Sequence, residues 1–226
     1  MILDWPSPAH PEAIEYAFGF RSARAACVLP KCLLIVPALF EEMNRTRRML
    51  VGAMRALDAH GIDAVLPDLP GCNESPVDFS AQSLDSWRGA MMDAAAHFGA
   101  THVLAVRGGA LVAPPGLPGW ALEPAKGAGL LRQLLRARVI NAREAGREEQ
   151  IEGLLAEGRS NGLELAGYRF GATLISDLES ALPRSHLAPI GLSGIGGPAL
   201  WLRSEPGEDA AQSTALAARI AAEMFG

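Results

Sequence analysis

One short segment, residues 105–110, constrains the fold of this chain more than any other. The apolar run His102–Val106 before it has the composition of a buried strand, and Arg107, Gly108 and Gly109 follow it directly. The paired glycines permit a sharp turn, and the small residues on either side of Arg107 let a following helix pack tightly against neighbouring strands. The segment therefore predicts a strand–turn–helix unit with an arginine at the tip of the turn.

Strand and helix patterns alternate before this turn. Buried-strand patterns occupy 32–36 and 62–66, and apolar residues recur at helical spacing from about residue 44 to residue 60. Ser83 is placed to cap a second helix, which Gly99 ends before the strand that leads to the turn. Such alternation predicts an α/β fold, a mostly parallel sheet with helices on both faces.

The second half of the chain has weaker patterns. We expect three further strands and a closing helix, at 119–122, 187–192, 199–202 and 210–225. Helical spacing at 130–140 and a charged helical segment at 143–157 lie between these strands. They predict a reduced or atypical cap, or small lid, within about 138–165. The sequence has no internal repeat or low-complexity linker, so we expect a single domain over 1–226.

Composition and charge argue against several functions. The net charge of −5 provides no basic footprint for binding nucleic acid. No stretch approaches the roughly 20 apolar residues of a membrane span, and the N-terminus does not have the pattern of a signal peptide. Cys27, Cys32 and Cys72 have no metal-binding spacing, so we expect reduced thiols, a cytoplasmic location, and no metal or other cofactor. The oligomeric state stays open, a homodimer included.

Three segments together resemble one protein family. Val36–Met49 reads VPALFEEMNRTRRM, Asp68–Ser75 reads DLPGCNES, and the turn Val106–Ala110 reads VRGGA. They are similar to the exosortase A system-associated hydrolases of the second type, which have the α/β-hydrolase fold and resemble serine aminopeptidases. Weaker similarity continues at 130–138 and 164–168. The resemblance implies a bacterial protein of an exopolysaccharide and protein-sorting system, in a family where arginine at this turn is usual.

In the α/β-hydrolase fold this turn is the nucleophile elbow, with the pattern Gly-x-Ser-x-Gly, and an acid and a histidine follow later in the chain. Arg107 occupies the nucleophile position, and its guanidinium stays protonated, so it cannot attack a substrate. His186 comes too early for the catalytic base, while Ser193 and Gly194 stand where the acid is expected. The missing triad predicts a degenerate hydrolase or an accessory protein.

Arg107 itself has two interpretations. It would serve as a clamp for a small anionic ligand, a carboxylate or phosphate, helped by backbone N–H groups at the start of the following helix, where Gly108 lies. Alternatively it pairs with Glu41 or Glu42, because an unpaired buried guanidinium is costly. The two coexist if a ligand displaces the carboxylate.

The loop before the first long helix lies where hydrolases build part of the oxyanion hole. A carboxylate there would oppose an oxyanion, whereas at the first turn of a helix it suits the helix dipole. The predicted ligand-binding residues are Phe40, Glu41, Glu42, Arg107 and Gly108.

Cys72 supports an alternative function, that of an active hydrolase of ester, thioester or peptide bonds with an unconventional nucleophile or an activated water. It stands where related folds often have a histidine in the loop after a strand. The sequence places no histidine beside it to activate the thiol. An unreactive loop cysteine is the simpler interpretation, with Asp68, Gly71 and Ser75 fixing the turn.

Overall fold

The computed structural model describes residues 1–6, 13–20 and 31–225, so Cys27 lies outside the described residues. Seven strands form one sheet in the order β1-β2-β4-β3-β5-β6-β9. The hairpin β1–β2 is antiparallel and joins β4 in antiparallel register, while all other neighbours in the sheet are parallel. The strands are Ile2–Pro6 (β1), Ile14–Phe20 (β2), Cys32–Val36 (β3), Asp63–Pro67 (β4), His102–Val106 (β5), Gly119–Leu122 (β6) and Ala188–Ile190 (β9).

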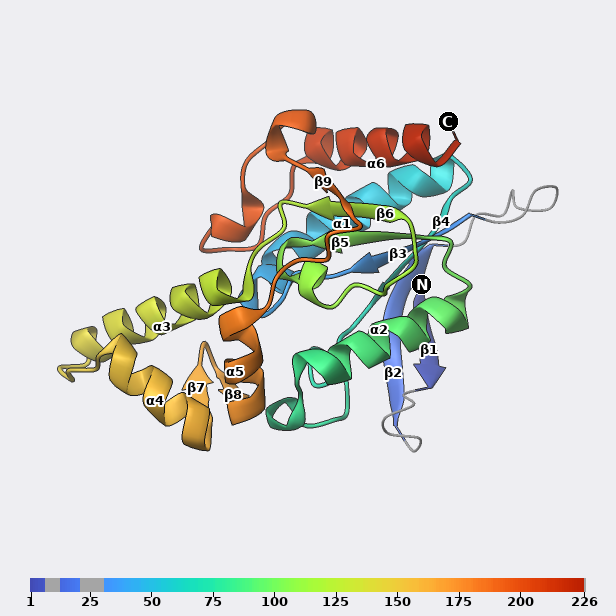
Figure 1. The fold of residues 1–226 in the computed structure, drawn as a ribbon. Coiled ribbons are helices and arrows are strands. Elements are labelled where there is room, and N and C mark those ends of the chain that lie inside the picture. The colour runs from blue at the N-terminus through green and yellow to red at the C-terminus, as the bar shows by residue number, and fades with distance from the viewer. Residues whose placement is uncertain (7–12, 21–30, 226) are drawn as a thin grey trace.

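Helices cover both faces of this sheet, as the alternation of patterns predicts (Figure 1). Leu33 and Ile35 of β3 enter a core shared with α1 and α6, whereas Leu34 and Val36 enter a core shared with α2. This alternation follows from the two-residue period of a strand, and it explains why the parallel strands are apolar on both sides. The three helices are Glu41–Ala59 (α1), Leu84–Phe98 (α2) and Ala210–Phe225 (α6).

The ends of α2 show the local rules that made it predictable. The Ser83 hydroxyl accepts a hydrogen bond from the Ser86 N–H at 3.0 Å, and the Ser86 hydroxyl accepts one from the Ser83 N–H at 2.9 Å. Gly99 ends the helix in the left-handed conformation at φ 64°. The predicted cap and C-terminus of this helix are therefore confirmed.

A group of further helices and a short hairpin follows β6 and extends beyond the sheet (Figure 1). It comprises Gly127–Glu144 (α3), Ile151–Asn161 (α4), the hairpin Leu163–Leu165 (β7) and Tyr168–Phe170 (β8), and Ala172–Ser180 (α5). Leu130, Leu134 and Phe170 belong to the same core as α2, so this cap packs on that face of the sheet. The range predicted for a cap, 138–165, lies within this group, and Gly146, at φ 73°, lies in the turn between α3 and α4.

Two features of the topology differ from the sequence predictions. The patterns did not predict β1 and β2, because Gly19 and the polar residues of these strands weaken the apolar signal. The predicted strand at 199–202 is wrong: Leu200–Leu202 is a 3₁₀ helix. It follows Gly196 and Gly197, both at positive φ, and Pro198, which has no N–H for a strand ladder. In the described residues, no helix combines the length and apolar character that a membrane crossing requires.

Candidate functional site

The elbow retains its sharp backbone although it carries no nucleophile. Arg107 follows β5 directly and has φ 53°, a left-handed conformation that is costly for a residue with a side chain. A Cβ at Gly109 would lie 2.4 Å from the carbonyl oxygen of Pro37, so only glycine fits where the turn packs against the end of β3. The predicted turn is therefore confirmed.

The helix expected after this turn is absent. Arg107–Leu111 is a short 3₁₀ helix, and the chain then enters a loop that contains Pro114 and Pro115. Proline lacks the backbone N–H that helical hydrogen bonding needs, and it disfavours helical geometry in the residue before it. The prediction that the N-terminus of a following helix helps to bind an anion here is therefore not met, because a five-residue 3₁₀ helix follows Val106 instead.

The guanidinium of Arg107 is held by a carboxylate from α1. Its Nε and Nη2 donate to the Oε2 and Oε1 atoms of Glu42 at 3.0 and 3.1 Å. Its Nη1 donates to the carbonyl oxygen of Glu123 at 3.0 Å. The side chains of Arg107 and Glu42 are only 15% and 5% exposed. Three of the five N–H donors are thus satisfied within the protein, and the internal ion pair is formed by Glu42 rather than Glu41.

A late segment covers this ion pair. The guanidinium carbon of Arg107 lies 4.6 Å from the centre of the Trp201 ring, a cation–π contact. Arg45 donates to the Trp201 carbonyl oxygen at 3.1 Å and to a carboxylate oxygen of Glu41 at 2.8 Å. The buried Trp201 thereby covers the guanidinium, and Glu41 is engaged with Arg45 of its own helix.

The space in front of the elbow is almost filled. A Cβ at Gly108 would lie 2.6 Å from a methyl carbon of Leu130 and 2.9 Å from Leu39 Cγ. The cavity beside the ion pair, lined by Phe40, Glu42 and neighbouring side chains, has a volume of about 20 Å³. That volume holds about one water molecule, which is too little for a substrate. Phe40, Glu42 and Gly108 therefore leave little free space at the elbow, whereas Glu41 is 46% exposed and lines a separate cavity of about 360 Å³ together with Arg138 and Arg147.

Phe40 connects this site to α1. It precedes the first helical residue with φ 59° and ψ −139°, a backbone conformation that residues with a side chain rarely adopt. Its ring packs against Phe170 of the cap at a centroid distance of 4.9 Å and against Trp87 at 6.1 Å. Phe40 thus fixes the start of the helix that presents Glu42, and it does so through apolar contacts.

Cys72 lies in the loop after β4 and is almost completely buried. Burial, with added repulsion from Asp68 and Glu15, raises the pKa of its thiol to about 12. The thiolate is the reactive form of cysteine, so this environment suppresses nucleophilic attack. The turn around Cys72 is held by Ser75, whose hydroxyl accepts a hydrogen bond from the Gly71 N–H at 2.8 Å.

The structure places two later residues that the sequence analysis weighed for a triad. His186 lies exposed in the turn before β9, and Ser193 lies in a 3₁₀ helix after that strand. In the part of the chain that the structure describes, no three His, Cys, Asp or Glu residues group together as metal ligands would.

Three residues of the site were not identified from the sequence. Glu123 is the first residue after β6, which lies next to β5. Its position at the carboxyl edge of the sheet, close to Arg107, could therefore have been inferred from the sequence. Its carboxylate also accepts a hydrogen bond from the Leu192 N–H at 2.7 Å. Arg45 and Trp201 gave no such signal, because their contact joins positions 156 residues apart.

Comparison with known proteins places this geometry in a known fold. No protein-family model matches this sequence, and no curated protein matches it. Among solved structures, the chain is similar to Est1E from Butyrivibrio proteoclasticus with ferulic acid bound, at TM-score 0.52 and 14% identity over 78% of this chain and 70% of that one. It is also similar to mouse alpha/beta hydrolase domain-containing protein 10, at TM-score 0.51 and 11% identity over 79% and 69% of the two chains.

A third similar structure covers nearly the whole of both chains. The bottromycin epimerase BotH, in complex with bottromycin A2, has TM-score 0.53 and 14% identity over 98% of this chain and 98% of that one. Identities this low support a statement about fold alone. Together with the mostly parallel sheet and the sharp turn after β5, these similarities show that the chain has the α/β-hydrolase fold.

Proposed function

We propose that this protein is a degenerate member of the α/β-hydrolase fold, an accessory protein that does not form a covalent acyl intermediate. The observation that carries the proposal is the state of Arg107. It occupies the nucleophile position, its guanidinium is bound at two atoms by Glu42, and Trp201 covers it. A guanidinium that stays protonated cannot attack a carbonyl carbon, and the cavity beside Glu42, about 20 Å³, has no room for a substrate.

The similarity to BotH shows that a protein of this fold can carry a function other than hydrolysis. That protein is named as an epimerase, and the likeness extends over almost all of both chains. A fold by itself does not determine chemistry, so this similarity assigns no reaction to the chain.

The sequence resemblance supports the biological setting of the proposal. It connects the chain with bacterial exopolysaccharide and exosortase systems, in which this protein would act in the cytoplasm. Its ligand would be a small carboxylate or phosphate that takes the place of the Glu42 carboxylate on Arg107. Such an exchange requires the cap or the Trp201 segment to move, because the site is closed in the described conformation.

The alternative of an active hydrolase that uses Cys72 has less support. A thiol with a pKa of about 12 is almost entirely protonated at neutral pH. Within the described residues, Cys72 has no histidine partner that would remove its proton.

Two assays test the proposed function. With p-nitrophenyl acyl esters we expect no turnover above buffer, and with a serine-directed fluorophosphonate we expect no labelling. The Cys72→Ala variant should behave as the wild type does. Robust ester turnover that Cys72→Ala abolishes would refute the proposal and establish the cysteine hydrolase.

The ligand is tested by thermal stabilisation with acetate, citrate and glucose 6-phosphate. Glu42→Gln removes the competing charge, so an anion that binds Arg107 should stabilise this variant more than the wild type. Arg107→Met/Glu42→Met has no cation at the site and should show no shift, and Glu208→Gln, which breaks an exposed pair with Arg48, should match the wild type. Equal shifts in all four proteins would contradict anion binding at the elbow.

A further inference from the structure

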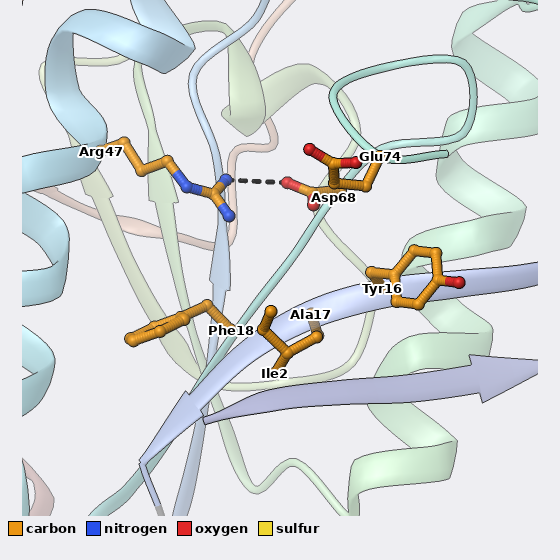
Figure 2. Close-up of a pocket in the computed structure, with 7 residues that line it drawn as sticks. All are labelled: Ile2, Tyr16, Ala17, Phe18, Arg47, Asp68 and Glu74. Carbon is orange, nitrogen blue, oxygen red and sulfur yellow. Dashed lines mark hydrogen bonds and ion pairs between the residues drawn. The ribbon is translucent and has the colours of Figure 1, made fainter. Parts of the chain in front are cut away.

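A second cavity lies away from the elbow, between α1 and the β1–β2 hairpin (Figure 2). Its volume is about 360 Å³, which is at the lower end of the range for small-molecule sites. In the sheet order, β4 and β3 separate β2 from β5, so the cavity and the elbow lie over different strands. The cavity is therefore a separate candidate site.

The floor of the cavity is apolar. Ile2 of β1 and Tyr16, Ala17 and Phe18 of β2 line it, with the Tyr16 hydroxyl as the one polar side-chain group among them, and Ile2 pairs with Phe18 across the hairpin. Ile2 is 76% exposed, an unusual position for a large aliphatic side chain within a sheet. The hairpin thus presents an apolar surface that the apolar part of a small ligand can cover.

The wall opposite this floor is polar and carries more negative than positive charge. Arg47 Nη1 donates to Asp68 Oδ1 at 2.7 Å, and Asn73 donates to the same oxygen at 2.6 Å. The Asp68 side chain is 3% exposed, so this pair is largely satisfied within the protein. Glu74 is exposed at the rim, and in the described part of the chain no residue forms an ion pair or hydrogen bond with it. One guanidinium and two carboxylates leave the wall with a net charge of −1.

We propose that this cavity binds a small organic cation, a primary amine attached to an apolar body. The ammonium group would bind the Glu74 carboxylate, with Asp68 adding to the attraction, and the apolar body would cover Ile2 and Phe18. An amine restores electrical neutrality to the wall, whereas an anion would meet two carboxylates and an arginine that is already paired. This inference uses no residue of the elbow and is independent of the proposed function.

Three probes with the same phenyl body test the charge preference: 2-phenylethylamine, the neutral 2-phenylethanol and the anion 3-phenylpropionate. Titration calorimetry at pH 7 should give the tightest binding for the amine and the weakest for the anion. The tripeptide amide Phe-Gly-Gly-NH₂ and its N-acetylated form extend the test. If the free tripeptide binds more tightly than the small amine, the natural ligand is a peptide N-terminus; the reverse order indicates a small amine.

Glu74→Gln is the decisive variant, because the exposed side chain can change without loss of folding. It should weaken 2-phenylethylamine about fivefold and leave 2-phenylethanol unchanged. Ile2→Ser should weaken both probes, since both use the apolar floor. Glu152→Gln makes the same chemical change at an exposed position on α4 and should alter neither. Binding of 3-phenylpropionate as tight as that of the amine, or amine binding unaffected by Glu74→Gln, would overturn the proposal.

Discussion

The ion pair between Arg107 and Glu42 provides the sharpest test of how this structure is stabilised. Glu42→Gln removes the charge and retains the shape of the side chain. Arg107 is then left with a hydrogen bond to the Glu123 carbonyl and with no carboxylate partner, in a site where its side chain is only 15% exposed. We therefore expect a large loss of stability from a change of a few atoms.

The size of the loss follows from burial. Removal of one partner from a buried ion pair costs about 3–5 kcal/mol, because the other charge stays buried without compensation. In a domain of this size 1 kcal/mol corresponds to about 2–4 °C in Tm, so Glu42→Gln should lower Tm by about 6–20 °C. Differential scanning calorimetry at pH 7 measures this change.

Two further variants make the test specific. Glu208→Gln breaks the pair between Arg48 and Glu208, whose side chains are 64% and 56% exposed, and should cost at most about 1 kcal/mol. Arg107→Met/Glu42→Met replaces both charges by apolar groups and should recover most of the loss. If Glu42→Gln lowers Tm no more than Glu208→Gln does, the pair is not held as the structure describes, and the reasoning about the closed elbow is refuted.

The remaining predictions concern the turn and the buried thiol. Gly109→Ala should destabilise by about 3 kcal/mol or more, because its Cβ would lie 2.4 Å from the Pro37 carbonyl oxygen. Gly129→Ala on exposed α3, where a Cβ meets nothing within 4 Å, should instead stabilise by about 0.5–1 kcal/mol, and urea unfolding compares the two. In a Cys27→Ser variant, Ellman's reagent at pH 8 should not react until the protein unfolds, since both remaining cysteines are buried; rapid reaction of the native protein would contradict this. The folded protein holds the Cys72 proton more tightly than the unfolded chain does, so stability should be full below pH 9 and decline as the pH rises from 9 towards 12. Cys72→Ala should make that decline shallower.

Local patterns were sufficient for the elements that run through the two cores. The strand β3 is apolar at every position, and the helix α2 carries its own signals in Ser83 and Gly99. The same reasoning failed for β1 and β2, where the stabilising partner is the neighbouring strand rather than a pattern within the segment. It also failed at 199–202, where an apolar run is buried as a 3₁₀ helix.

In the candidate site, too, some features follow from the sequence and others only from the tertiary structure. The sequence by itself determined the sharp turn with arginine at its tip, because the paired glycines after a buried strand permit a turn and the close packing that a side chain would block, and it determined that this arginine cannot be a nucleophile. Only the tertiary structure decided that Glu42 binds the guanidinium and that Trp201 covers it, since the first contact joins positions 65 residues apart. Two adjacent glutamates are chemically equivalent in a sequence. They differ here because α1 turns Glu42 towards the buried elbow and Glu41 towards solvent and Arg45.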